Sequence, residues 1–133
     1  MTLRLWNMST YQCITVIEGV YCYYTNSLYQ IDKDRVIVGG VNSFSIVNID
    51  KCVIEKRIKD ESLGYVNCFL KLRDNKTILC GCLDGIICFY DMNTKQYKIT
   101  KNNHNDYAIT DLLLIDDNTF LSCSYKTIKV WRY

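Results

Sequence analysis

The chain has 133 residues, 49% of them hydrophobic, which is enough apolar material for a domain core. Its 16 Lys and Arg residues nearly balance 14 Asp and Glu residues, so the basic surface typical of a nucleic-acid-binding protein is absent. The sequence has no apolar run long enough to span a bilayer and no secretory signal pattern. We therefore expect a cytoplasmic protein that binds neither nucleic acid nor a membrane.

Eleven tyrosines, together with frequent Ile, Val and Thr, favour strands over long helices. The eight cysteines are expected to be buried small side chains in a reducing compartment. We expect no metal site, because there is no C-x-x-C pair and His104 is the only histidine.

In chain order, the apolar and turn residues predict strands at 3–7 and 12–17, then two sets of four strands within 24–58 and 66–100. A final set of three strands follows, from residue 109 to residue 131. We divide the chain into units at 1–18, 19–60, 61–101 and 102–133, where the first unit is a partial blade and the last lacks its fourth strand.

An internal repeat supports this division. The aromatic or apolar residues that close successive units are Trp6, Val47, Tyr90 and Trp131, at intervals of 41, 43 and 41 residues. Turn residues recur before each second strand, at Asp32, Asp74 and Asp117. The first strands are expected to begin eight residues earlier, at Tyr24, Val66 and Ile109.

The segment 122–131, S-C-S-Y-K-T-I-K-V-W, resembles the S-G-S-x-D-x-T-I-K-V-W segment of WD repeats, and 80–91 is a weaker copy. His104 lies 27 residues before Trp131, where the family has its loop histidine. The resemblance covers essentially the whole chain. It implies an all-β fold, a partial β-propeller of about three four-stranded antiparallel blades.

In WD repeats a His, an Asp, a Ser or Thr and the Trp form a hydrogen-bonded structural network. The resemblance assigns to such networks His104, Ser122, Ser124, Trp131 and, in the middle blade, Asp84. The last blade has no turn Asp, because Tyr125 and Lys126 occupy a turn one residue shorter than the family pattern. We expect every network to be incomplete and the blades to pack mainly by hydrophobic contact.

We find no nucleophile elbow, phosphate-binding loop or metal-ligand set, and so predict no enzyme activity and no cofactor. The main hypothesis is a non-catalytic protein–protein interaction scaffold in an intracellular complex, with other proteins or peptides as partners. The proposed contact residues, on the family's upper rim, are Tyr65, Tyr107, Tyr125 and Lys126. Further tyrosines in or beside these loops are Tyr21, Tyr23 and Tyr24.

Two alternatives remain open. One is the substrate-recognition part of a ubiquitin ligase, although W-D-x-R does not follow the third strand in either 131–133 or 90–93. The other is a non-functional fragment of a larger WD-repeat protein. Since three blades would leave open sheet edges, we expect completion by missing blades or a head-to-tail homodimer.

Overall fold

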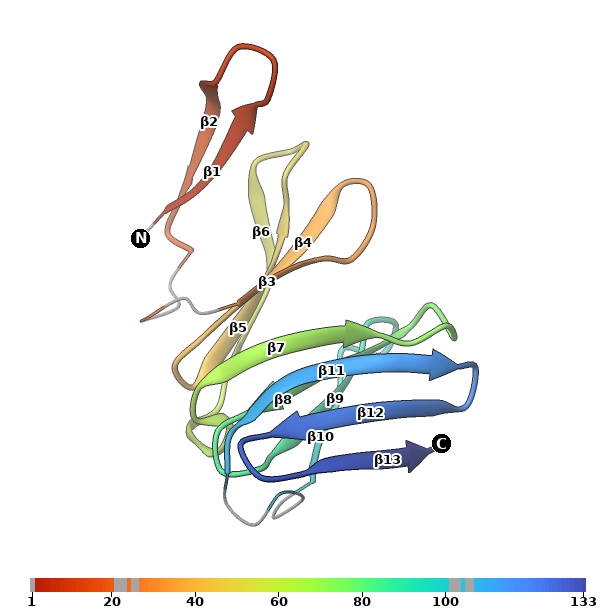
Figure 1. The fold of residues 1–133 in the computed structure, drawn as a ribbon. Helices are drawn as coiled ribbons and strands as arrows, with labels where there is room; N and C mark the ends of the chain where they lie inside the picture. Colours follow the sequence, from red (N-terminus) through yellow and green to blue (C-terminus); the bar gives the residue numbers. More distant parts are fainter. Residues whose placement is uncertain (1, 21–23, 25–26, 101–103, 105–106) are drawn as a thin grey trace.

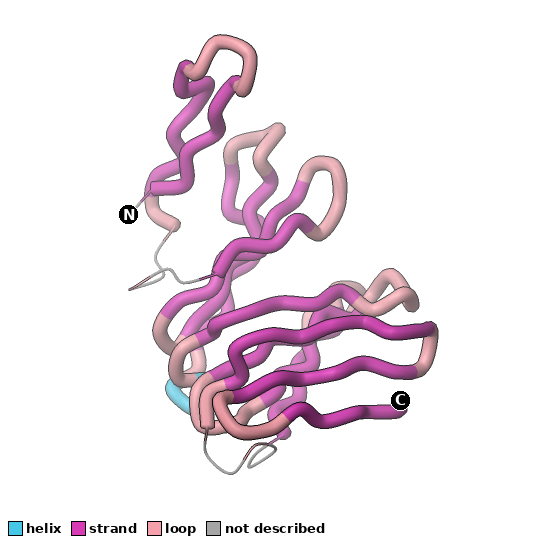
Figure 2. The backbone as a smooth tube through the Cα atoms, in the orientation of Figure 1, coloured by secondary structure: helices cyan, strands magenta, loops and turns pink. Residues whose placement is uncertain are grey.

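The computed structural model describes residues 2–20, 24, 27–100, 104 and 107–133. Over these residues the chain forms four antiparallel sheets and one short 3-10 helix (Figures 1 and 2). The prediction of an all-β fold built from antiparallel blades is confirmed. None of the helical structure in the described part is long and apolar enough to cross a bilayer.

The sheets follow one another along the chain. A hairpin contains β1 (Thr2–Asn7) and β2 (Gln12–Glu18). The first blade contains β3 (Ser27–Gln30), β4 (Arg35–Gly40), β5 (Ser43–Asn48) and β6 (Val53–Lys59). After η1 (Glu61–Leu63), the second blade contains β7 (Val66–Lys71), β8 (Thr77–Cys82), β9 (Ile87–Asp91) and β10 (Tyr97–Thr100). The third blade contains β11 (Ile109–Asp116), β12 (Thr119–Ser124) and β13 (Ile128–Arg132).

Aspartates shape the turns that precede the second strand of each blade. The Asp32 carboxylate accepts the backbone N–H of Arg35 at 2.9 Å, and Asp74 accepts that of Thr77 at 2.9 Å. The turn N–H groups have no partner on a neighbouring strand, and these hydrogen bonds satisfy them, which is why Asp is favoured in the turn. In the third blade Asp117 lies in the turn before the second strand, as predicted, and the carboxylate that accepts the turn N–H of Asn118, at 2.9 Å, is that of Asp116.

The predicted starts of the first strands hold for two blades of three. Val66 and Ile109 are the first residues of β7 and β11. Tyr24 does not begin a strand: it has a φ of 51°, lies in a turn and is 73% exposed, and β3 starts at Ser27. A positive φ is incompatible with extended backbone, so the strand has to begin later.

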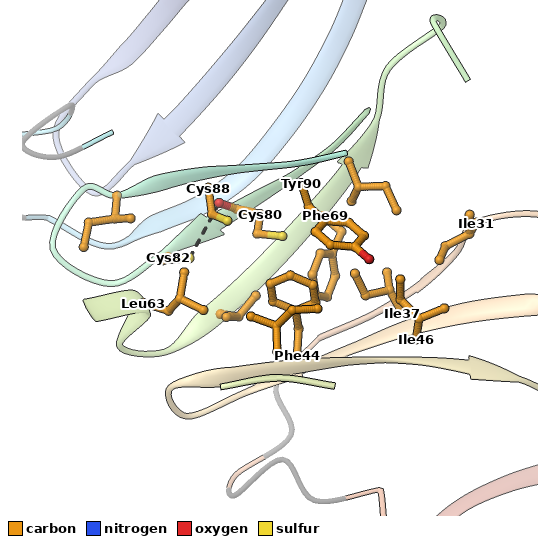
Figure 3. Packing of buried hydrophobic residues seen from close by; sticks show 14 residues of the cluster. Ile31, Ile37, Phe44, Ile46, Leu63, Phe69, Cys80, Cys82, Cys88 and Tyr90 are labelled. Atoms are coloured by element: carbon orange, nitrogen blue, oxygen red, sulfur yellow. Dashed lines mark hydrogen bonds between the residues drawn. The ribbon is translucent and has the colours of Figure 1, made fainter. Parts of the chain in front are cut away.

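Aromatic and aliphatic side chains fill the space between the first and second blades. The Phe44 ring meets Phe69 and Tyr90 edge to face, with centroids 6.4 and 5.4 Å apart (Figure 3). Cys80 and Cys88 are fully buried in the same cluster. Each buried large side chain of this kind contributes about 1.5–3 kcal/mol. The interface is therefore a continuous hydrophobic core.

Glycines in the second strands allow adjacent blades to approach closely. A Cβ placed on Gly81 would lie 2.7 Å from Ile109 Cγ2, and one on Gly39 would lie 2.9 Å from Val66 Cγ1. Val66 and Ile109 begin the first strands of the following blades. The repeat thus has a glycine, which lacks a side chain, at the point where the first strand of the next blade passes.

The hairpin packs at the end of the arc away from the third blade (Figure 1). Its Ile17 is 5% exposed and packs in a small core with Val38 and Val47 of the first blade. The Arg57 side chain also donates a hydrogen bond to the Gly19 carbonyl at 2.5 Å.

The cysteines differ in their surroundings. The expectation of buried thiols is confirmed for Cys80, Cys82 and Cys88, and burial raises the pKa of Cys80 and Cys82 well above the ordinary thiol value. The expectation was wrong for Cys13 and Cys52, which are exposed. Cys13 lies on the hairpin strand, and Cys52 lies in a turn at φ 55°.

Candidate functional site

A buried histidine at one end of the third blade is hydrogen-bonded to three hydroxyl groups of this blade. His104 is 1% exposed, and its Nε2 lies 2.6 Å from Ser122 Oγ. Its Nδ1 lies 2.7 Å from Thr127 Oγ1 and 3.0 Å from Ser124 Oγ. Trp131 Nε1 donates to the same Ser122 hydroxyl at 2.7 Å. The network therefore links the loop before β11 to both β12 and β13.

Strand geometry brings these side chains together. Ser122 and Ser124 are two residues apart on β12, so both side chains point to the same face of the sheet. Trp131 is opposite Phe120 in the β12–β13 pairing and stacks on its ring at 5.9 Å. The histidine backbone rests against Gly85 of the second blade, where a Cβ would lie 2.8 Å from His104 N.

The hydrogen bonds suit a neutral imidazole. We assign the ring proton to Nδ1, which then donates to Thr127 Oγ1, while the Ser122 hydroxyl donates to Nε2 and accepts from Trp131. Burial lowers the pKa of His104 below its usual 6.5, and the nearby Lys129 ammonium lowers the pKa further. If the imidazole were protonated, His104 Nε2 would also donate to Ser122 Oγ, which already accepts a hydrogen bond from Trp131 Nε1.

Thr127 corrects the expectation of an incomplete network in this blade. The two-residue turn at 125–126 brings Thr127 Oγ1 within 3.2 Å of Ser124 Oγ. The Thr127 hydroxyl lies 2.7 Å from His104 Nδ1, so this nitrogen has a partner although the blade has no turn Asp. Within the described residues, no buried side-chain nitrogen or oxygen lacks a hydrogen-bond partner. The shortened turn was the sequence signal that could have identified Thr127.

The second blade is built differently at the same positions. Cys80, Cys82 and Tyr90 stand where the third blade has Ser122, Ser124 and Trp131, and all three lie in the hydrophobic cluster. In this blade, the expectation of packing by hydrophobic contact agrees with the structure. Asp84 lies in the β8–β9 turn at φ 57°, is exposed, and does not join the His104 network.

An aromatic patch lies on the turn above the network, and we define it as Tyr107, Tyr125 and Lys126. The two tyrosine rings are 6.2 Å apart, and Lys126 Nζ lies 4.7 Å from the centre of the Tyr107 ring. Tyr125 is 84% exposed. The Tyr107 N–H donates to the His104 carbonyl at 3.1 Å, which ties the patch to the buried histidine.

The family model described as "WD domain, G-beta repeat" matches residues 95–132. The matched range contains β10 and the third blade with its network and aromatic patch. Residues 95–132 are therefore similar to a WD repeat. A comparison with curated proteins finds no match.

WD repeats generally form surfaces for protein–protein interaction and are generally non-catalytic. Within residues 95–132, which match this model, the aromatic patch contains three of the four predicted contact residues. The fourth, Tyr65, belongs to the second-blade side of the arc, is 37% exposed, and accepts the Leu83 N–H at 2.8 Å through its carbonyl. Tyr21, Cys22 and Tyr23 lie outside the described residues.

In the part of the chain that the structure describes, no three His, Cys, Asp or Glu residues gather closely enough to hold a metal ion. The thiols of Cys80 and Cys82 are buried, and desolvation raises their pKa and so favours the protonated form, which is a poor nucleophile.

Proposed function

We propose that this protein is a non-catalytic scaffold of an intracellular complex, and that its aromatic patch contacts a segment of another protein. The observation that carries the proposal is Tyr125, which is 84% exposed and stands on a turn fixed by a buried hydrogen-bond network. An exposed aromatic ring on a rigid support loses little entropy when a partner covers it.

The patch has the composition of an interface hot spot. Tyrosine is enriched at the centres of interfaces because its ring buries a large area and its hydroxyl still bonds to polar groups. The contact between the Lys126 ammonium and the Tyr107 ring would strengthen when a partner excludes water. The described cysteines are free thiols, which supports a reducing compartment.

A photo-crosslinking experiment tests this proposal. We would replace Tyr125 with a photoreactive phenylalanine analogue and, as a matched control, place the same analogue at Tyr11 on the hairpin turn, which is 78% exposed. In extracts of expressing cells, adducts of discrete mass should form from position 125 and not from position 11. Equal labelling from both positions, or none from position 125, would refute the proposal.

A second variant separates recognition by the patch from simple exposure. Lys126→Glu keeps an exposed, charged turn residue but reverses the charge beside Tyr107, so the adducts from position 125 should fall about tenfold or more. Circular dichroism should show an unchanged melting temperature, because Lys126 is exposed and takes no part in the His104 network. Undiminished adducts would show that the patch does not recognise the partner.

A further inference from the structure

Two cysteines face each other across the middle of the second blade. Cys80 of β8 and Cys88 of β9 are register partners in this antiparallel pair, and both side chains are fully buried. Burial raises the pKa of the Cys80 thiol, and so does the side-chain hydrogen bond that it makes with Cys88. Figure 3 shows both side chains in the core between the first two blades. The two sulfur atoms are therefore in contact and shielded from water.

The spacing of directly opposite strand residues suits a disulfide. Such residues have Cα atoms about 4.5–5.5 Å apart, and disulfides join cysteines whose Cα atoms are about 4.4–6.8 Å apart. Their Cβ atoms are about 4.5–5.5 Å apart, slightly more than the roughly 3.5–4.5 Å of a relaxed disulfide. A bond between Cys80 and Cys88 would draw the two strands together and be easily reduced. The pair is thus suited to a reversible bond.

The other cysteines of this blade lack this geometry. Cys82 is two residues from Cys80 on the same strand, about 6.6–6.8 Å away, and the two side chains point in parallel. Cys68 is opposite Gly81 and packs against the other core, between the second and third blades. Among the cysteines that the structure describes, Cys80 and Cys88 form the one pair that faces across two strands.

The outer edge of the blade gives an oxidant a route to Cys88. The strand β10 has four residues and is the end strand of the sheet order β10-β9-β8-β7. Its Ile99 pairs with Cys88 and is only partly buried where it packs against the core. Short edge strands open locally at a small cost in free energy, and this opening would uncover Cys88 before Cys80, which lies one strand farther in. Cys88 is therefore the thiol that reacts first.

We propose that Cys80 and Cys88 form a site of reversible oxidative modification, at which a peroxide converts the two thiols into a disulfide. The Cys88 thiolate attacks a peroxide oxygen: the S–O bond forms, the O–O bond breaks, and the departing hydroxide leaves as water with the proton that Cys88 released. The Cys80 sulfur then attacks the sulfur of the Cys88 sulfenic acid. The S–S bond forms, the S–O bond breaks, and the leaving hydroxide takes the Cys80 proton as a second water. The two sulfurs are oxidised and the peroxide is reduced.

Peptide mapping of the full chain tests the proposal. The reduced protein is treated with hydrogen peroxide, blocked with N-ethylmaleimide in denaturant, and digested on the N-terminal side of aspartate. Cleavage before Asp84 separates Cys80 from Cys88 and gives peptides 74–83 and 84–90. These two peptides should remain joined by a disulfide, and dithiothreitol added before blocking should release them.

The exposed thiols of Cys13 and Cys52 serve as the internal control, because they show that the oxidant has reacted. Peptides 74–83 and 84–90 that stay unlinked while Cys13 and Cys52 are oxidised would overturn the proposal. A link found only between two chains, and not within monomeric protein, would also overturn it.

Three variants identify the sulfurs and the route. Cys82→Ala should leave the linked peptides at the level of the parent chain, although Cys82 is as buried as Cys80 and lies on the same strand. Cys80→Ala should abolish them. Ile99→Ala, which loosens β10, should speed formation of the link about fivefold or more. A link that persists in Cys80→Ala, is lost in Cys82→Ala, or forms no faster in Ile99→Ala would refute this assignment.

Discussion

The two hydroxyls around His104 Nδ1 give a prediction about how the network stabilises the third blade. Nδ1 has Thr127 Oγ1 at 2.7 Å and Ser124 Oγ at 3.0 Å, so either hydroxyl alone can accept its proton. Thr127→Val keeps the shape of the side chain and removes one of the two acceptors. We expect Thr127→Val and Ser124→Ala to lower the free energy of unfolding by about 1 kcal/mol each.

The double variant should lose more than the sum of the single losses. With both hydroxyls removed, a buried ring nitrogen has no partner, which adds a desolvation cost of about 1–3 kcal/mol. The expected total is about 3–5 kcal/mol, with a coupling energy of about 1–3 kcal/mol between the two positions. His104 is 1% exposed, so water cannot easily replace either hydroxyl.

Urea unfolding monitored by circular dichroism measures these losses, with the slope checked for constancy among variants. Thr110→Val is the matched control, because Thr110 is exposed and bonds weakly to the Cys123 carbonyl at 3.3 Å. Its effect should stay within about 0.5 kcal/mol. Strictly additive losses would refute the reasoning, since they would mean that Nδ1 is not shared between the hydroxyls or that water reaches it.

Three further predictions follow from described contacts. Burial lowers the pKa of His104, so the unfolded chain binds a proton at this histidine more readily than the folded chain does. The free energy of unfolding should therefore fall as the pH drops below about 6.5. In urea titrations from about pH 7 to 5, His104→Gln should reduce this dependence on pH. Gly81→Ala should lower the free energy of unfolding by about 1–3 kcal/mol, because the new Cβ meets Ile109 of the third blade. An unchanged melting temperature would contradict the close approach of Gly81 to Ile109. Tyr90→Ala should lower the free energy of unfolding by about 3–5 kcal/mol and Trp131→Ala by less, because Tyr90 is 1% exposed and Trp131 is only half-buried. Equal losses of free energy in urea unfolding would contradict this difference in burial.

Much of the fold was predictable because the repeat places similar residues in similar surroundings. Val66 and Ile109 begin their strands as expected, since both pack against a glycine of the preceding blade. Tyr24 occupies the same phase but adopts a positive φ. The repeat position of a residue therefore does not by itself specify its backbone conformation.

The site was less predictable than the fold. Sequence pattern indicated His104 and Trp131, because the family motif fixes their spacing. It did not reveal that Thr127 and Ser124 both bond His104 Nδ1 in a blade without the turn Asp, since that depends on a turn geometry that brings the two hydroxyls within 3.2 Å of each other. A groove of the second blade, lined in part by Phe89, Lys98 and Thr100, was also not foreseen, because a cavity arises from the packing of whole sheets rather than from any residue type.

Cys123 occupies the place in β12 that Gly39 and Gly81 hold in the preceding blades, at intervals of 42 residues. Its side chain points away from the second blade, because Ser122 beside it points toward that blade. A Cβ added at Gly81 would already lie 2.7 Å from Ile109 Cγ2 of the next strand, so a strand could not approach the outer face of the third blade as closely at Cys123. The arc therefore has a direction: a sheet can stack closely against each of the first two blades, whereas any neighbour on the third must stand farther off or cross at another angle.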